Sequence, residues 1–553
     1  MNKYILIKNG TLVSKDHDSE KNDILVNNEK IEEVSPEINE NMDWKIIDAE
    51  GKIVSPGFID MHSHCDFHFP YKKHVQLYEP LLYQGVTTSF AGNCGHSFFP
   101  VTGENRETLD ESVGFMAMGK IDYKWGGFKE YTDYLKDNIV MNFASLVGHG
   151  SLRINVAGLK RELNREELKL QDDLLIESLE SGCYGLSTGL MYVPGTFSTT
   201  DELIHLSKIA SKYPNAIYAS HYRGNGYTYI EALKEMVDIG EKTGIKTHIS
   251  HLGPPFGVRY IDVIGTKLDE AFKLIDEAKN KGISLSFDCM SYTDGNTTIM
   301  ALFPPWTYNE GEQKFLEDIK DDIKFREIMK YIQTYVPKWP TWEGDGWTDN
   351  IVDFIGWENI YILGTKDKNI FGKSLTQIAT EKNKEVSEVL REIILEEGTA
   401  LSVYLKGLCG VKDYNDEKGL KNYDRILERK DCLIGVDALF TDGVSGMGLY
   451  GNYSRLITRY VKNKKTITLK DAIERFTNKA ADTIGLKNRG YLRKGNYADI
   501  VVFDFDKYQD YPVMFGNKPK NTTGIENLLI NGKIIIENKK INKILPGKVL
   551  LNK

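Results

Sequence analysis

The chain has 553 residues, 41% of them hydrophobic and 27% charged, which is typical of a soluble globular protein. Its formal net charge of -9 at pH 7 argues against nucleic acid as a partner, because phosphate binding needs a clustered positive surface. No run approaches the roughly 18 apolar residues of a membrane span, so the sequence predicts no membrane segment.

The length exceeds the usual size of one compact core, so we expect one large domain and a smaller one. The N-terminal stretch Met1–Lys8 is too short and too soon charged for a signal peptide. The six cysteines are scattered without a paired framework, which suits a reducing compartment. These features together predict a cytoplasmic protein.

Both ends of the chain consist of short strand-like runs separated by turns such as Asn9-Gly10 and Glu50-Gly51. Neither terminal block is long enough to form a stable sheet alone. We therefore expect residues 1–55 and 490–553 to pack together into one small β-sandwich domain.

Residues 56–489 alternate between strand-like and helical patterns, which predicts an α/β fold with a TIM-type (β/α)8 barrel. The predicted strands are Gly57–Met61, Gly85–Ala91, Asn142–Val147, Gly182–Ser187, Ala216–Ser220, Lys246–Ser250, Ile283–Asp288 and Cys432–Val436. An open doubly wound sheet would need a glycine-rich turn after its first strand, whereas this strand ends in histidines. A polar and aromatic stretch near 293–350 does not fit the repeat, and we interpret it as an insertion able to close over the barrel mouth.

Metal-competent side chains recur where the predicted strands end, which is where barrel enzymes carry their chemistry. His62 and His64 follow strand one and are separated by one residue, so an extended backbone directs both imidazoles to one side. The other candidates follow later strands and are Cys94, His221, His251 and Asp437. Any one of these histidines alone would more often be structural, but their recurrence at matched positions predicts a metal centre.

These motifs resemble a known family. Pro56–His64 is similar to the opening of the amidohydrolase superfamily, most members of which bridge two metals with a carbamylated lysine. We find no convincing candidate for that lysine, and Gly92–Gly95 instead resembles the N-acyl-D-amino-acid deacylase (D-aminoacylase) branch, where a cysteine takes its place. Gly185–Gly195, Leu302–Trp306 and Arg489–Asp499 resemble the same branch, so the likeness runs nearly end to end.

The resemblance implies a zinc-dependent metallohydrolase of non-peptide amide bonds. Its substrate would be an N-acyl-D-amino acid or a related N-acyl amine, attacked by metal-bound hydroxide. Cys94, His221 and His251 would hold one tightly bound zinc, since a thiolate and two imidazoles leave a position open for water. A second, weaker metal site would comprise His62, His64 and Asp437, with Cys94 as a candidate bridge.

The resemblance also implies catalytic roles. Asp437 would be the general base that takes a proton from the metal-bound water and passes it to the leaving amine. Tyr192 resembles the residue that hydrogen-bonds the oxyanion of the tetrahedral intermediate, and it would also contact the substrate.

Three further residues are candidates for substrate binding. Arg223 could meet a substrate carboxylate or brace a neighbouring ligand, and His149 could line the pocket or be an ordinary loop histidine. Tyr292 is the second tyrosine of the family's Tyr-Pro-Tyr, whose first tyrosine is replaced here by Met290. The family's usual lysine after strand six is replaced by Gly253. Because the missing groups resemble those that recognise a free carboxylate, D-amino-acid specificity does not follow from the resemblance.

Two other hypotheses remain open at this stage. A cyclic amide or imide hydrolase of the hydantoinase or dihydropyrimidinase type is the alternative enzyme, and the absence of a bridging lysine counts against it. A non-catalytic metal-binding barrel is the third. In either enzyme the partner is a small-molecule amide, and the sequence leaves the oligomeric state open. His68, His96 and His248 receive no role.

Overall fold

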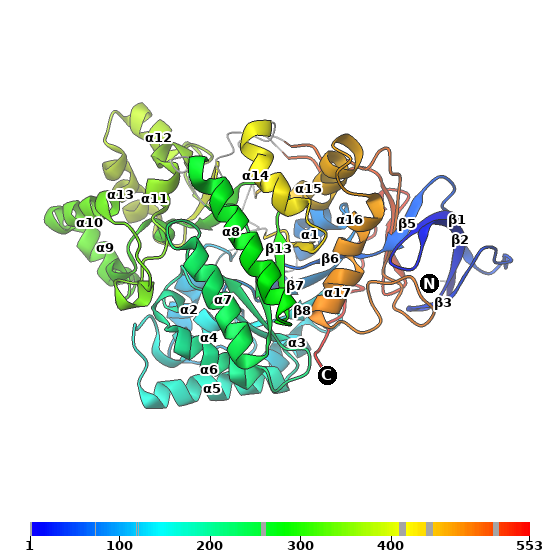
Figure 1. Cartoon of the computed structure of the whole chain (residues 1–553), viewed down its shortest axis with the longest axis horizontal. Helices are drawn as coiled ribbons and strands as arrows, with labels where there is room; N and C mark the ends of the chain where they lie inside the picture. The colour runs from blue at the N-terminus through cyan, green and yellow to red at the C-terminus, as the bar shows by residue number, and fades with distance from the viewer. Residues whose placement is uncertain are drawn as a thin grey trace.

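The structure is a computed structural model that describes residues 3–71, 73–117, 119, 121–255, 261–408, 416–437, 446–512 and 519–553. A central barrel lies between two additions (Figure 1). The strands of the chain termini lie at one end of the molecule, and a group of helices from the segment after residue 290 lies at the other.

Eight parallel strand positions form the barrel. They are occupied by β6 (Phe58–Asp60), β7 (Val86–Ala91), β8 (Asn142–Ser145) continued by β9 (Val147–Gly148), β10 (Gly185–Gly189), β11 (Ile217–His221), β12 (Lys246–Ile249), β13 (Leu285–Cys289) and β17 (Cys432–Ile434). Pairing runs β6-β7-β8 in one piece and β9-β10-β11-β12-β13-β17 in the other.

Backbone hydrogen bonds join the two pieces into a closed ring. The Met61 amide donates to the Ile434 carbonyl at 3.2 Å, which connects β17 to the end of β6. The Tyr184 amide donates to the Ser145 carbonyl at 2.9 Å, which connects β8 to the approach of β10. These bonds confirm the predicted barrel.

Helices cover the outside of the barrel. They are α1 (His74–Leu82), α2 (Arg106–Val113), α3 (Phe128–Leu135), α4 (His149–Ala157), α5 (Arg165–Glu180), α6 (Thr200–Ala210), α7 (Tyr229–Thr243), α8 (Ile261–Asn280), α14 (Glu417–Leu427), α15 (Gly448–Arg455), α16 (Leu469–Phe476) and α17 (Asn478–Ile484), with one π-helical segment, η8 (Leu456–Asn463).

Local sequence explains where several of these helices begin and end. Asn164 starts α5 with a capping box, in which its side chain accepts hydrogen bonds from the amides of Glu166 and Glu167. Gly244 ends α7 in the left-handed conformation that terminates many helices. No helix of the described ranges has both the length and the apolar character needed to cross a bilayer.

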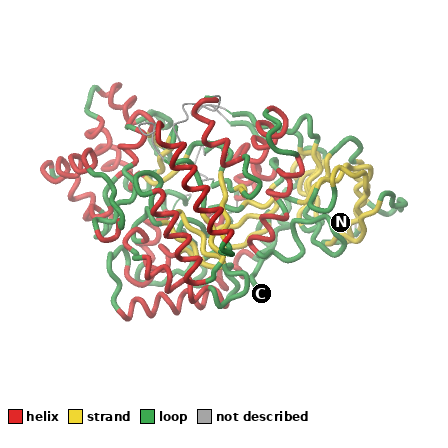
Figure 2. The backbone as a smooth tube through the Cα atoms, viewed as in Figure 1, coloured by secondary structure: helices red, strands yellow, loops and turns green. Residues whose placement is uncertain are grey.

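The two ends of the chain share one sheet. Its strands are β1 (Tyr4–Val13), β2 (Asp18–Asn27), β3 (Lys30–Ser35), β4 (Lys45–Asp48) and β5 (Ile53–Pro56), then β18 (Ile500–Phe503), β19 (Ile525–Ile530), β20 (Lys533–Glu537) and β21 (Lys540–Ile541). Antiparallel pairing of β5 with β18 joins the two ends, and Figure 2 shows these strands gathered beside the barrel. Apolar side chains from both ends, including Ile7, Val26, Ile500 and Leu529, form one core.

The segment between β13 and β17 is larger than the insertion predicted near 293–350. It contains a small sheet of β14 (Gly295–Thr298), β15 (Ile360–Ile362) and β16 (Ser402–Leu405). It also contains the helices α9 (Glu312–Lys320), α10 (Asp322–Thr334), α11 (Ile351–Ile355), α12 (Leu375–Lys382) and α13 (Val386–Glu397). From sequence, a short strand followed by amphipathic helices is indistinguishable from another barrel repeat, which explains why the prediction stopped short.

Candidate metal centre

The six predicted ligands meet at the carboxyl ends of the barrel strands. His62 and His64 follow β6, Cys94 follows β7, and Asp437 follows β17. His221 is the last residue of β11, and His251 lies two residues beyond β12. A parallel barrel brings all its strand ends to one face, so residues far apart in sequence become neighbours.

The ligand atoms fall into two groups that share Cys94. His62, His64, Cys94 and Asp437 form one group, and Cys94, His221 and His251 form the other, with the ligand atoms of each group within 4.8 Å of one another. The Cys94 Sγ lies 3.2 Å from His62 Nε2, 3.8 Å from His221 Nδ1 and 3.6 Å from His251 Nε2. Asp437 Oδ1 lies 3.5 Å from His62 Nε2 and 3.3 Å from His64 Nε2.

Three of these residues hold left-handed backbone conformations. The φ angles of Cys94, His251 and Asp437 are 52°, 38° and 43°. Side chains other than glycine rarely adopt this region, and such strain concentrates at functional sites. Around Cys94 the fit is close, since a Cβ on Gly95 would lie 2.6 Å from the Gly189 nitrogen, and one on Gly189 would collide with the Cys94 carbonyl.

The electrostatics of the cluster suit a cation. Burial opposes ionisation of the Cys94 thiol, but the charge of His62 and hydrogen bonding to His221 hold its pKa well below the ordinary value. Burial alone would raise the pKa of Asp437, yet His62 and the hydrogen bond from His64 lower it to about 2. Burial alone would lower the pKa of His64, whereas Asp437 and Cys94 raise it to about 9. A thiolate and a carboxylate thus face protonated imidazoles, whose protons a metal ion can replace.

The donor set fits zinc, which binds thiolate, imidazole and carboxylate groups. His221 Nδ1 and His64 Nε2 are the ring nitrogens that face the Cys94 thiolate and the Asp437 carboxylate, so these two atoms are placed to bind a metal ion. The residues present therefore suit a metal centre of one or two ions.

Asp288 and His248, for which the sequence predicts no role, lie behind this centre. The Asp288 carboxylate lies between two histidines: its Oδ2 is 3.6 Å from His62 Nδ1 and 2.7 Å from His248 Nε2. Its Oδ1 also accepts a hydrogen bond from the His251 amide at 2.8 Å. Asp288 is the last residue of the predicted strand Ile283–Asp288, and the candidate ligands also follow predicted strands. That strand-end position is the sequence signal that could have identified it.

A pocket of about 830 Å³, including its open mouth, lies against the metal ligands. His64, Cys94, His221, His251 and Asp437 line it, together with Tyr192, Asn225, Asn296 and Thr297. The Tyr192 hydroxyl lies 3.2 Å from Thr297 Oγ1, and its ring centroid lies 5.3 Å from that of His221.

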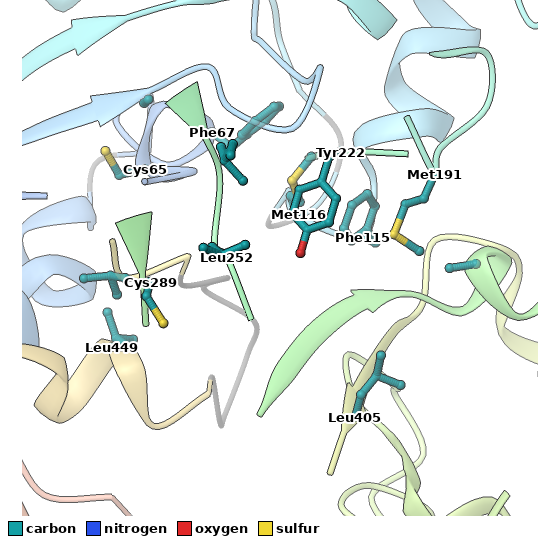
Figure 3. Close-up of a cluster of buried hydrophobic side chains, with 14 of the residues drawn as sticks. Cys65, Phe67, Phe115, Met116, Met191, Tyr222, Leu252, Cys289, Leu405 and Leu449 are labelled. Atoms are coloured by element: carbon teal, nitrogen blue, oxygen red, sulfur yellow. The ribbon is translucent and has the colours of Figure 1, made fainter. Parts of the chain in front are cut away.

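Apolar side chains form much of the remaining pocket wall. Figure 3 shows Phe115, Met116 and Met191 on neighbouring segments of the chain, and all three line the pocket, as does Leu405. Gly253 and Met290, the two departures from the family pattern, also line this pocket.

The other three predicted substrate contacts are not among the described lining residues of this pocket, and each has a different partner. The buried Arg223 donates to Glu235 at 3.1 Å and to the carbonyls of Thr196 and Ser198.

His149 and Tyr292 are also bound elsewhere. The His149 ring lies 2.9 Å from Glu202 Oε1, and the Tyr292 hydroxyl donates to Asp510 Oδ2 at 2.7 Å. These partners favour a role in holding the surrounding structure over direct contact with substrate.

Comparison with known proteins agrees with this geometry. Sequence models of the amidohydrolase family match residues 45–244 and 378–535. The chain is 27% identical to D-aminoacylase of Alcaligenes xylosoxydans xylosoxydans over 91% of its own length and 88% of the relative's. It is also 27% identical to N-acyl-D-glutamate deacylase of the same organism, over 91% of this chain and 87% of that one.

Solved structures have the same fold. A D-aminoacylase variant in complex with copper chloride matches with a TM-score of 0.77 at 25% identity, covering 99% of both chains. N-acyl-D-glutamate deacylase of Bordetella bronchiseptica, complexed with zinc and a phosphonate mimic of the tetrahedral intermediate, matches with a TM-score of 0.76 at 24% identity over 99% of both chains. A D-hydantoinase is more distant, with a TM-score of 0.53 at 14% identity. The chain is a metal-dependent hydrolase that belongs to the amidohydrolase family, on the branch of the D-aminoacylases.

Proposed function

We propose that this hydrolase uses zinc to cleave the amide bond of an N-acyl-D-amino acid or a closely related N-acyl amine. The observation that carries the proposal is one thiolate, Cys94, shared by two ligand groups beside a carboxylate that faces the pocket. The similarity to D-aminoacylase and N-acyl-D-glutamate deacylase supports the same class of substrate.

Cys94, His221 and His251 would hold the tighter zinc, and His62, His64 and Asp437 a weaker one in contact with the same thiolate. When bound, zinc polarises an amide carbonyl and makes water acidic enough to attack it near neutral pH.

Asp437 acts as the general base in this proposal. Because its pKa of about 2 keeps it ionised at neutral pH, it can accept a proton from the attacking water at the pocket wall. It then returns that proton to the leaving amine, which departs as a neutral molecule.

Tyr192 supplies a hydrogen bond to the developing oxyanion. Burial and the nearby Cys94 thiolate raise the pKa of Tyr192 above its ordinary value, so the phenol stays protonated and can donate. A donor already positioned where negative charge develops stabilises the transition state more than the ground state.

The far end of the substrate is recognised without the family's lysine. Gly253 and Met290 provide no charge where they line the pocket. We therefore infer that a free carboxylate on the amine contributes less to binding here than in the relatives.

We also infer a cytoplasmic location. It is supported by Cys65, Cys94, Cys183, Cys289 and Cys432, which are all buried and free.

The test is a substrate panel with zinc-loaded protein. The panel contains N-acetyl-D-amino acids, their L-enantiomers and N-acyl amines that lack a carboxylate. We expect hydrolysis of at least one open-chain amide, lost on chelation and restored by zinc. If zinc-loaded protein hydrolyses none of them, the proposal is wrong, and ring opening of a hydantoin alone would identify a cyclic amide hydrolase instead.

A further inference from the structure

A second chamber lies beside the metal pocket. It encloses about 580 Å³, including its opening, and the two cavities share His96, Phe115 and Tyr192 as walls. The other walls of the chamber include Glu111, Glu312, Thr399 and Tyr308. A group in this chamber is thus separated from the metal pocket by single side chains.

The chamber has two carboxyl groups in its walls, Glu111 from α2 and Glu312 from α9, and no lysine or arginine among its described lining residues. Desolvation of its carboxylate and the charge of Glu312 raise the pKa of Glu111 to about 7. Glu312 is held in place, because its Oε1 accepts hydrogen bonds from the Thr399 amide at 3.0 Å and from the Thr399 hydroxyl at 2.8 Å.

His96 gives an independent sign of a ligand. Its ring is 4% exposed, it lines both cavities, and neither ring nitrogen has a hydrogen-bond partner among the described residues. A neutral imidazole offers one acceptor and one donor, and leaving both unused in a buried position is unfavourable. A polar group entering the chamber would satisfy this ring.

We propose that the chamber is a subsite for a positively charged group, a primary ammonium or a guanidinium, that the substrate carries on an arm extending past Tyr192. The inference rests on the proposed amide hydrolysis and names the substrate class more closely. Glu111 and Glu312 accept the charged hydrogen bonds, and the imidazole acceptor of His96 adds a third.

The remaining walls suit such an arm. Tyr308, Phe115 and Tyr192 supply aromatic rings to the chamber wall, and Val193 and Met300 supply apolar side chains suited to methylene groups.

The test compares matched amides whose arm ends in an ammonium, a guanidinium or a methyl group of similar size. One series carries the arm on the acyl group and the other on the amine, so the two series identify which end enters the chamber. We expect kcat/KM to be about 10-fold to 100-fold higher for the charged member in one series, as for hydrogen bonds to charged groups. Equal kcat/KM for charged and methyl members in both series would overturn the subsite.

Substitutions in the chamber test whether its carboxyl groups cause the preference for the charged arm. Glu312→Gln and Glu111→Gln should each reduce the preference for the charged arm about tenfold. Glu317 on α9, which does not line the chamber, provides the matched control, and E317Q should leave the preference unchanged. A preference that survives both chamber substitutions would contradict the proposal.

Direct binding separates this inference from the proposed reaction. If no amide in either series is hydrolysed, the proposed function is wrong, and calorimetry with butylguanidinium and zinc-loaded protein decides the subsite alone. Binding that is lost in Glu312→Gln supports it, and no binding to the unchanged protein overturns it.

Discussion

Individual residues at this centre combine strained backbone with shifted ionisation. Cys94 and Asp437 both have left-handed backbones, and both have lowered pKa values. The surrounding barrel fixes each in a conformation that the isolated chain would rarely adopt. The centre is therefore held ready for a metal by the fold.

The two ligand groups predict how many zinc ions each ligand variant retains. Replacing His62 and His64 with alanine removes two of the four members of one group and leaves Cys94, His221 and His251 intact. We expect this double variant to retain one zinc per chain in elemental analysis. Cys94→Ala, which removes the shared ligand, should lose the tighter zinc as well. A double variant without zinc would show that the assignment of the tighter site is wrong.

Substitution of Asp437 or Tyr192 should lower kcat. Asp437→Asn removes the base, and we expect kcat to fall about 100-fold to 10,000-fold while the tighter zinc remains. Tyr192→Phe removes one oxyanion donor, which should reduce kcat about 100-fold to 1,000-fold with a smaller change in KM. Steady-state kinetics with the best substrate of the panel measures both. Unchanged kcat in Asp437→Asn would remove it from the mechanism.

At the scale of elements, contacts between neighbouring strand ends orient the candidate metal ligands. Asp288 at the end of β13 contacts His62 after β6, His248 in β12 and the amide of His251. A carboxylate that orients a ligating histidine commonly tunes metal affinity.

Asp288→Asn should therefore weaken zinc binding about 10-fold to 100-fold without unfolding the barrel. Competition with a chelator measures the affinity, and circular dichroism checks the fold. Ser286→Ala is the matched control, since Ser286 contacts the same His248 ring, at 2.8 Å, without touching His62. Equal zinc affinity in Asp288→Asn and the unchanged protein would contradict this role.

Three helices meet at the carboxylate of Glu202, which is largely but not fully buried. Glu202 of α6 accepts hydrogen bonds from Arg153 of α4 at 2.8 Å and from Gln171 of α5 at 3.3 Å, and lies 2.9 Å from the His149 ring. Burial alone would raise the pKa of Glu202, but His149 and Arg153 lower it to about 2.

A lowered pKa stabilises the folded protein above the pKa of the unfolded glutamate and ceases to do so as pH falls towards the folded value. We expect Glu202→Gln to lose up to about 3 kcal/mol of stability at pH 7 and to show a shallower decline between about pH 4.5 and 2. Urea unfolding of metal-free protein at several pH values measures this. Parallel pH profiles for the two proteins would contradict the expectation.

At the scale of the whole molecule, a buried polar network joins the barrel to the terminal sheet. Asp499 pairs with Arg489, and its Oδ2 accepts a hydrogen bond from Asn142 in β8 at 3.1 Å. Its Oδ1 accepts one from the Asn531 amide at 2.7 Å. One carboxylate thus connects a barrel strand to the segments on both sides of β18.

Asp499→Ala should destabilise the protein by about 3 to 5 kcal/mol, because it leaves the buried Arg489 without its charge partner. Calorimetry measures the loss. Combining Arg489→Met with Asp499→Leu should restore part of the stability, since the uncompensated charge is gone. A double variant less stable than Asp499→Ala would show that the network contributes more than charge pairing.

The sequence by itself determined the barrel and predicted which six side chains gather at its strand ends. Strand-end positions, the His62-x-His64 spacing and the Gly92-Asn93-Cys94-Gly95 motif are local patterns, and a parallel barrel brings them to one site. The gathering of these residues was therefore predictable without knowing the packing around them.

Only the tertiary structure decided which polar residues line the pocket. Arg223, His149 and Tyr292 are bound to partners 12, 53 and 218 residues away, and no local pattern announces such pairings. The acidic chamber likewise combines α2 with α9, two helices that the sequence places far apart. The positions of the candidate ligands follow from the local pattern of the strands. The partner of a polar side chain depends instead on which distant residues the fold packs against it.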